Sequence, residues 1–85
     1  MKRYYKRDAE SDLGQGVAYI EITDGRPSRQ VEIYGEHYRF GDVEHNEFLA
    51  DQPFEALDLN SEHEIEVSEF DRVWSQAQKR CLQSK

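Results

Sequence analysis

The sequence predicts an α+β fold, a small antiparallel β-meander of three to five strands with one C-terminal helix packed on it. Alternating apolar and polar residues between positions 17 and 40, turn residues between those runs, and one helical apolar stripe near the end indicate this fold. The chain has 85 residues and is expected to form a single domain, residues 1–85. Its aromatic content of 12% favours a folded domain although 34% of the residues are charged.

The N-terminal part is expected to form two strands. The first is Lys2–Arg7, and the polar, glycine-containing stretch Asp8–Gly16 is expected to be a loop. Val17–Thr23 is the clearest strand, because its alternate residues face opposite sides of a sheet. One side carries Ala18, Ile20 and Ile22, and the other carries Val17, Tyr19, Glu21 and Thr23.

Two further strands follow the turn residues Asp24-Gly25-Arg26-Pro27. Ser28–Tyr34 is expected to point Arg29, Val31 and Ile33 one way and Gln30, Glu32 and Tyr34 the other. Gly35-Glu36 fits a two-residue hairpin turn. His37–Phe40 then returns as a short strand with Tyr38 and Phe40 on its apolar face.

The C-terminal helix is predicted from a capping signal, Ser68 with Asp71 three residues later. One helical stripe follows, at spacings of three and four: Phe70, Val73, Trp74, Ala77 and Cys81. We expect this stripe to cover the apolar face of the meander. A second, short helix is expected around Glu44–Ala50, ending before Pro53.

Charge is distributed unevenly along the chain, whose net charge is −7. Residues 1–40 carry seven acids and seven bases, whereas Gly41–Asp71, here called the acidic segment, carries eleven acids and no Lys or Arg. Such a segment repels phosphate, so direct nucleic-acid binding is disfavoured. It attracts a basic protein surface or a cation.

Several classes of protein are disfavoured by what the sequence lacks. No apolar run approaches the roughly 20 residues of a membrane helix, and the basic N-terminus is not followed by the apolar stretch of a secretory signal. The one cysteine, Cys81, cannot form an internal disulfide, so a cytoplasmic location is expected. No motif for catalysis or for a cofactor is present.

The leading hypothesis is therefore a non-enzymatic protein-binding module with a basic partner, for example an acidic inhibitor or immunity-type protein. Two groups of contact residues are expected. The exposed face of the sheet is expected to supply Tyr19, Glu32 and Tyr34. The acidic segment is expected to supply Asp42, Glu44, Glu47, Asp51, Glu55 and Asp58. A mimic of nucleic acid, with its acids in two regular rows, is an alternative.

A calcium-binding loop is a further alternative. Asp58, Asn60, Glu62 and Glu69 occupy positions one, three, five and twelve of an EF-hand-like pattern. His63 stands at position six, where the sharp turn favours glycine, and Pro53 interrupts the incoming helix. The alternative reading is an acidic loop that leads into the C-terminal helix.

Two short stretches resemble a set of small uncharacterised bacterial proteins. These stretches are Arg29-Gln30-Val31-Glu32-Ile33-Tyr34-Gly35 and Glu69-Phe70-Asp71-Arg72-Val73-Trp74. Proteins of that set begin with a Tyr-rich strand and end in a helix with a Glu-Phe-x-x-Val/Leu-Trp motif. The resemblance implies a small sheet with a helix, and it carries no assigned activity.

Overall fold

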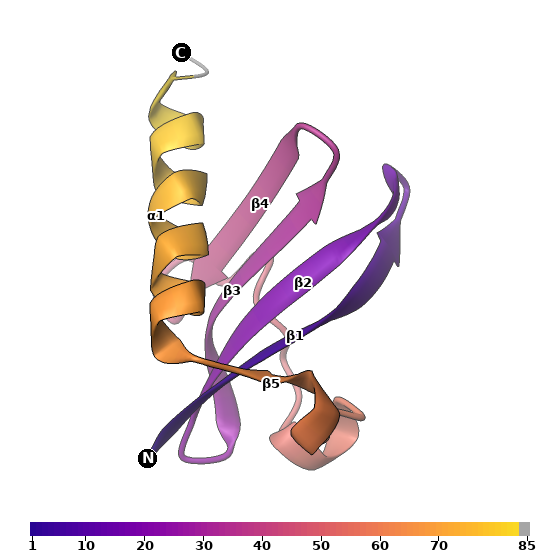
Figure 1. Ribbon diagram of the computed structural model, residues 1–85, viewed down its shortest axis with the longest axis vertical. Helices are drawn as coiled ribbons and strands as arrows, with labels where there is room; N and C mark the ends of the chain where they lie inside the picture. The colour runs from indigo at the N-terminus through magenta and orange to yellow at the C-terminus, as the bar shows by residue number, and fades with distance from the viewer. Residues whose placement is uncertain (84–85) are drawn as a thin grey trace.

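The computed structural model describes residues 1–83, with the backbone alone from Cys81 onward. Four consecutive antiparallel strands form the sheet: β1 (Lys2–Ser11), β2 (Gly14–Thr23), β3 (Arg26–Tyr34) and β4 (His37–Asp42). A two-residue strand, β5 (Glu64–Ile65), pairs with the start of β1, so the strand order is β4-β3-β2-β1-β5. Helix α1 (Val67–Gln83) lies along one side of the sheet (Figure 1). The predicted α+β fold is confirmed.

The predicted turns between the strands are also present. Asp24 and Gly25 connect β2 to β3 with φ angles of 50° and 86°. Two successive positive φ angles are the mark of a type I′ turn, whose twist suits a two-residue hairpin. Gly35 and Glu36 form the next two-residue turn, between the paired residues Tyr34 and His37.

The expected loop at Asp8–Gly16 is wrong, because β1 and β2 continue through it as a paired hairpin. Ser11 pairs with Gly14, and only Asp12 and Leu13 lie in the turn. Gly16 belongs to the strand because its backbone lies against β3. A Cβ atom at Gly16 would lie 2.1 Å from the Ile33 carbonyl oxygen. The glycine therefore permits a close approach of two strands rather than marking a loop.

Helix α1 covers one face of the sheet with the predicted stripe. Phe70, Val73 and Ala77 are buried in one cluster with Tyr19 and Val31. Burial of a side chain as large as valine or phenylalanine stabilises the fold by about 1.5–3 kcal/mol. The helix begins at Val67, so Ser68 lies within the first turn and not at the predicted cap position. The predicted packing of Cys81 lies outside the described side chains.

The acidic segment covers the opposite face of the sheet, which is the alternative to an exposed tyrosine-bearing face. It contains two short 3₁₀ helices, η1 (Phe54–Ala56) and η2 (Ser61–His63). On this face one cluster of apolar side chains is buried, with further apolar residues of the acidic segment packed against it. The buried members are Tyr5, Ile20, Ile22 and Leu59, and Phe54 and Leu57 pack against them.

The expected helix at Glu44–Ala50 is wrong, because backbone groups of this stretch bond to the sheet. The N–H of Ala50, at the end of this stretch, donates to the Gln30 side-chain oxygen at 2.8 Å, and a helix would have required that N–H for a bond within itself. Beyond the stretch, the N–H of Phe54 donates to the Gly25 carbonyl at 2.9 Å. These contacts hold the chain against β3 and the β2–β3 turn.

A buried ion pair joins β2, β3 and α1. The Glu21 side chain is 2% exposed, and its carboxylate accepts two hydrogen bonds from Arg29, at 2.6 and 3.0 Å. Ser28 donates a third at 2.7 Å. The Arg29 guanidinium carbon lies 5.0 Å from the centre of the Phe70 ring and 5.1 Å from that of Trp74. The same guanidinium contacts a carboxylate of the helix, Asp71, at 3.3 Å.

We expect Arg29→Ala to lower the free energy of unfolding by about 3 kcal/mol, because the buried Glu21 carboxylate loses its counter-charge. This is the lower end of the range for buried pairs, since Arg29 keeps 26% of its side chain exposed. Urea denaturation measures the loss. Arg72→Ala, at an exposed arginine of α1, is the control and should change stability by less than about 0.5 kcal/mol. Equal stability of the two variants would contradict the importance of the pair.

Stability should also depend on pH through Glu21. Burial alone raises the pKa of its carboxyl, but the hydrogen bonds from Arg29 and Ser28 outweigh burial and hold the pKa below its ordinary value of 4.5. A lowered folded-state pKa contributes stability that is complete above 4.5 and is lost as the pH falls through the folded-state value. Glu21→Gln should therefore be less stable than the wild type at pH 7, with a difference that shrinks below about pH 4.5. A difference that stays constant down to pH 3 in urea titrations would refute this assignment.

Candidate functional site

The sheet-face residues predicted for binding are not on an open surface. Tyr19 is 8% exposed beneath α1, and Tyr34 is 4% exposed on the opposite face. Glu32 is half-buried and accepts a hydrogen bond from the Tyr34 hydroxyl at 2.7 Å. Burial and this hydrogen bond raise the pKa of Tyr34. The expectation of one exposed sheet face that carries Tyr19 and Tyr34 is wrong. The two tyrosines lie on opposite faces, and both faces of the sheet are covered.

The predicted contact residues of the acidic segment lie at the surface. All but one are exposed: Glu44, Glu47, Asp51, Glu55 and Asp58. The exception, Asp42, is half-buried at the end of β4. The chain from β4 to α1 therefore packs Phe54, Leu57 and Leu59 on the sheet and turns most of its carboxylates toward solvent.

The EF-hand-like residues do not converge on one point. Asn60 caps η2 by accepting a hydrogen bond from the Glu62 N–H at 2.8 Å, and the His63 ring accepts one from the Asn60 N–H at 3.2 Å. After η2 the backbone becomes extended at Glu64 and joins β1. Among the described residues no group of three or more His, Cys, Asp and Glu side chains is placed to hold a metal ion. The pattern thus forms a capped 3₁₀ turn that enters a strand.

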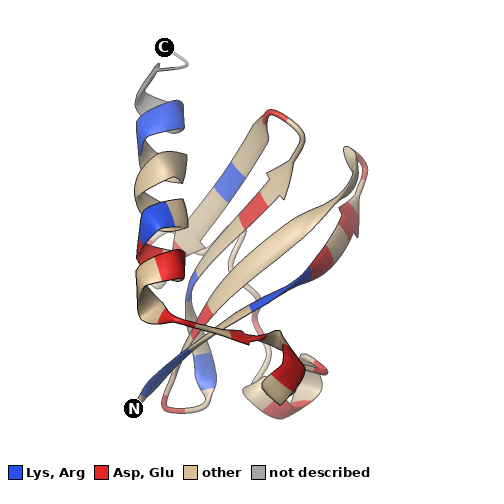
Figure 2. Cartoon of the chain, in the orientation of Figure 1, with Lys and Arg blue, Asp and Glu red and all other residues tan. Residues whose placement is uncertain are grey.

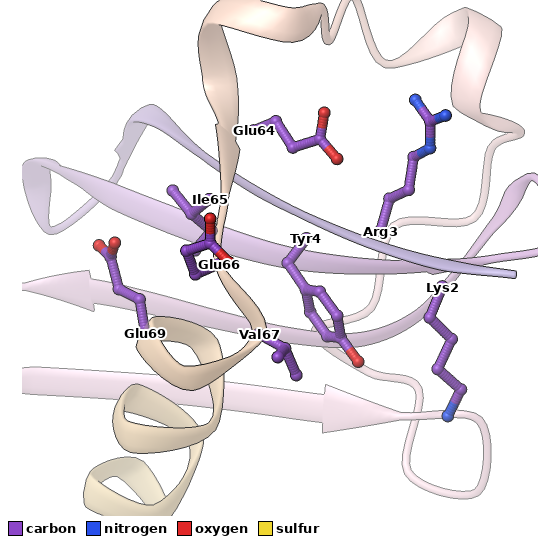
Figure 3. Close-up of a pocket in the computed structure, with 8 residues that line it drawn as sticks. All are labelled: Lys2, Arg3, Tyr4, Glu64, Ile65, Glu66, Val67 and Glu69. Atoms are coloured by element: carbon purple, nitrogen blue, oxygen red, sulfur yellow. The ribbon is translucent and has the colours of Figure 1, made fainter.

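Part of the acidic charge is balanced by the bases of β1. A broad pocket of about 840 Å³ lies where β1 meets β5 and the start of α1. Figure 3 shows Lys2 and Arg3 on one side of it, with Glu64 extending toward Arg3. A hydrogen bond with Tyr5 and the charge of Glu64 raise the pKa of Arg3. Nearby, the Lys6 ammonium lies 4.0 Å from the Glu69 carboxylate. Because both signs of charge line this region, it has little net field to attract a charged partner.

The remaining carboxylates of the acidic segment have no such partner. Within the part of the chain that the structure describes, no ion pair involves any of six exposed acids: Glu44, Glu47, Asp51, Glu55, Asp58 and Glu62. Figure 2 shows basic residues along the first part of β1, acidic residues toward the end of that strand, and acidic residues on the short helical turns beside it. These six acids lie on one irregular segment and not on two parallel elements, which gives no support to a nucleic-acid mimic.

Asp42 shapes the loop that follows it. Its carboxylate accepts hydrogen bonds from the N–H groups of Glu44 at 3.0 Å and His45 at 2.8 Å. The N–H of Asp42 in turn donates to the His45 carbonyl at 3.0 Å. These backbone hydrogen bonds, chiefly that from His45, hold the pKa of Asp42 below its ordinary value. Asp42 is thus a structural residue of the loop and Glu44 an exposed one.

One surface residue that the sequence reasoning passed over is Val43, whose side chain is 69% exposed. In the sequence Val43 stands between two acids, Asp42 and Glu44. A single exposed apolar side chain is common on protein surfaces, so Val43 indicates a contact site only as part of a larger apolar patch.

No helix among the described residues has the length and apolarity needed to cross a membrane. Comparisons with protein-family models, with curated proteins and with solved structures find no match for this chain. The resemblance to small bacterial proteins therefore stays a prediction, and the proposals below depend on the geometry of this chain alone.

Proposed function

We propose that this protein is a non-enzymatic binding module that docks on the basic surface of another protein. The observation that carries the proposal is the set of six exposed carboxylates between Glu44 and Glu62 that lack a cationic partner among the described residues. No lysine or arginine interrupts this stretch, whereas the exposed acids Asp8 and Glu10 directly follow two bases in β1. The field of the acidic segment is therefore the strongest of one sign on the chain.

The way the acidic segment is held supports this role. Hydrogen bonds to Gln30 and Gly25 and the apolar cluster around Leu59 fix it to the sheet. A fixed array of charges loses little conformational entropy when a partner binds. Complementary charges also steer the encounter and raise the association rate constant by roughly 10-fold to 1000-fold. One concrete form of this function is an acidic inhibitor or immunity-type protein that masks a basic enzyme surface.

The non-enzymatic part of the proposal is supported by the state of the buried carboxylate. Glu21 is the acid most shielded from water, and burial of that kind is how enzymes often tune a general acid or base. Here Arg29 and Ser28 occupy its oxygens and lower its pKa, so the carboxylate is committed to the fold. A cytoplasmic location is part of the proposal, since Cys81 cannot form an internal disulfide.

The proposal predicts a stoichiometric partner whose binding depends on the acids of the segment. Tagged protein is used to retain the partner from a lysate of the source organism, and the partner is identified by mass spectrometry and purified. Glu44→Gln/Glu47→Gln/Asp51→Asn should then slow its association by about tenfold or more in stopped-flow measurements at low salt. Higher salt should reduce the difference between this variant and the wild type, because salt screens surface charges.

The matched control is Asp8→Asn/Glu10→Gln/Glu36→Gln, which removes the same number of exposed acids outside the acidic segment. It should associate nearly as fast as the wild type. Equal slowing by both variants would show that only net charge matters. A partner whose association ignores both salt and the triple substitution would refute the electrostatic function.

A further inference from the structure

An open groove of about 590 Å³ lies where the acidic segment runs beside the β2–β3 hairpin. Its apolar lining comes from two parts of the chain: Pro27 at the start of β3, and Val43, Leu49 and Ala50 of the acidic segment. Pro27 is buried, Leu49 and Ala50 are half-buried, and Val43 is exposed. The apolar part of the groove therefore has a floor formed by Pro27, Leu49 and Ala50 and one solvent-exposed wall formed by Val43.

The loop that carries Val43 is held in shape before any partner arrives. The Asp42 carboxylate fixes the two residues after Val43, as described above, and the Leu49 N–H donates to the Asn46 carbonyl at 3.1 Å. Gly41 allows this loop to lie directly on β4. A Cβ atom there would lie 2.8 Å from the His45 carbonyl oxygen and 3.3 Å from the Leu49 nitrogen. Val43 is thus displayed by a supported turn.

The surroundings of the groove are predominantly acidic. Asp51 lies on its lining, and the exposed residues Glu44 and Glu47 each follow a lining residue directly in the sequence. Arg26 also lines the groove and is the one base among the lining residues, all of which lie in the described part of the chain. The two charged lining residues, Asp51 and Arg26, balance each other, so the negative excess beside the groove comes from exposed acids of the same loop, Glu44 and Glu47. Apolar centres with charged rims are the usual arrangement of protein-binding hot spots.

We propose that this groove is the anchor site of the binding module, and that it accepts an aromatic or large aliphatic side chain flanked by Lys or Arg on a partner protein. The proposal rests on the proposed function, because the acids that steer a basic partner border the groove. An apolar anchor site would let the protein distinguish among basic partners, which charge attraction alone does not do. A basic surface without an apolar side chain would reach the acidic segment but would leave the groove empty.

The test uses the whole chain, labelled with ¹⁵N, and two short peptides. In the first peptide one tryptophan is flanked on both sides by Lys and Arg, and in the second glycine replaces the tryptophan. The tryptophan peptide should bind about tenfold more tightly in NMR titrations, because its ring buries apolar area that glycine lacks. Its shifts should centre on the amides of Ser28, Val43, Asn46, Leu49 and Ala50.

Val43→Ser should weaken the tryptophan peptide about threefold to tenfold and leave the glycine peptide unchanged. The control is Val67→Ser, at another exposed valine, which should change neither affinity. Folding of both variants is checked in the same spectra. Asp42→Asn keeps the side-chain oxygen of the turn and should bind the tryptophan peptide better than Asp42→Ala does.

Equal affinity for the two peptides, or shifts centred on η1 and η2, would overturn the anchor site while leaving the electrostatic function standing. Failure of both peptides to bind at low salt would also overturn the anchor site. Failure of the proposed function itself shows separately, as a partner whose association ignores the Glu44, Glu47 and Asp51 substitutions.

Discussion

The buried carboxylate of Glu21 is the constraint on which the arrangement of this protein depends. It lies on the face of β2 that α1 covers, where an ionised group is tolerated only with a close counter-charge. Arg29 stands opposite Glu21 in the β2–β3 register and supplies two N–H donors in one plane. Its guanidinium also lies beside the rings of Phe70 and Trp74. A shift of the strands or of the helix would separate these groups, so the pair fixes strand register and helix position together.

The two faces of the sheet are covered by elements of different kinds. Helix α1 offers a regular stripe, whereas the acidic segment is irregular and is tied to the sheet by a few hydrogen bonds and one apolar cluster. A chain of this size buries a modest share of its surface, and covering both faces increases that share. The irregular cover has a functional consequence. Phe54, Leu57 and Leu59 of this cover pack on the sheet, whereas most of its carboxylates face solvent and form the surface that we propose a partner meets.

The acidic segment is negative along its whole length in the sequence, but in the folded chain some of its acids lie close to bases. The bases of β1 lie beside the later part of the acidic segment, where the Lys6 ammonium lies 4.0 Å from the Glu69 carboxylate and the charge of Glu64 raises the pKa of Arg3. The acids from Glu44 to Glu62 form no ion pair among the described residues, although Arg7 donates a hydrogen bond to the Leu57 carbonyl beside them. The unbalanced field is thus confined to one region. The groove beside Val43 lies at the β4 end of that region, where apolar contact adds to charge attraction.

The sequence by itself determined the central parts of the four main strands, a turn at Asp24-Gly25 and the helical stripe from Phe70 to Ala77, because these follow from local alternation, turn chemistry and helical spacing. It also determined which residues carry the acidic charge. Only the tertiary structure decided that Tyr19 and Tyr34 are buried and that Val43 is exposed. Alternation separates two faces but does not say what covers each one. The cover comes from residues distant in the chain, whose backbone groups bond to the sheet instead of to their neighbours.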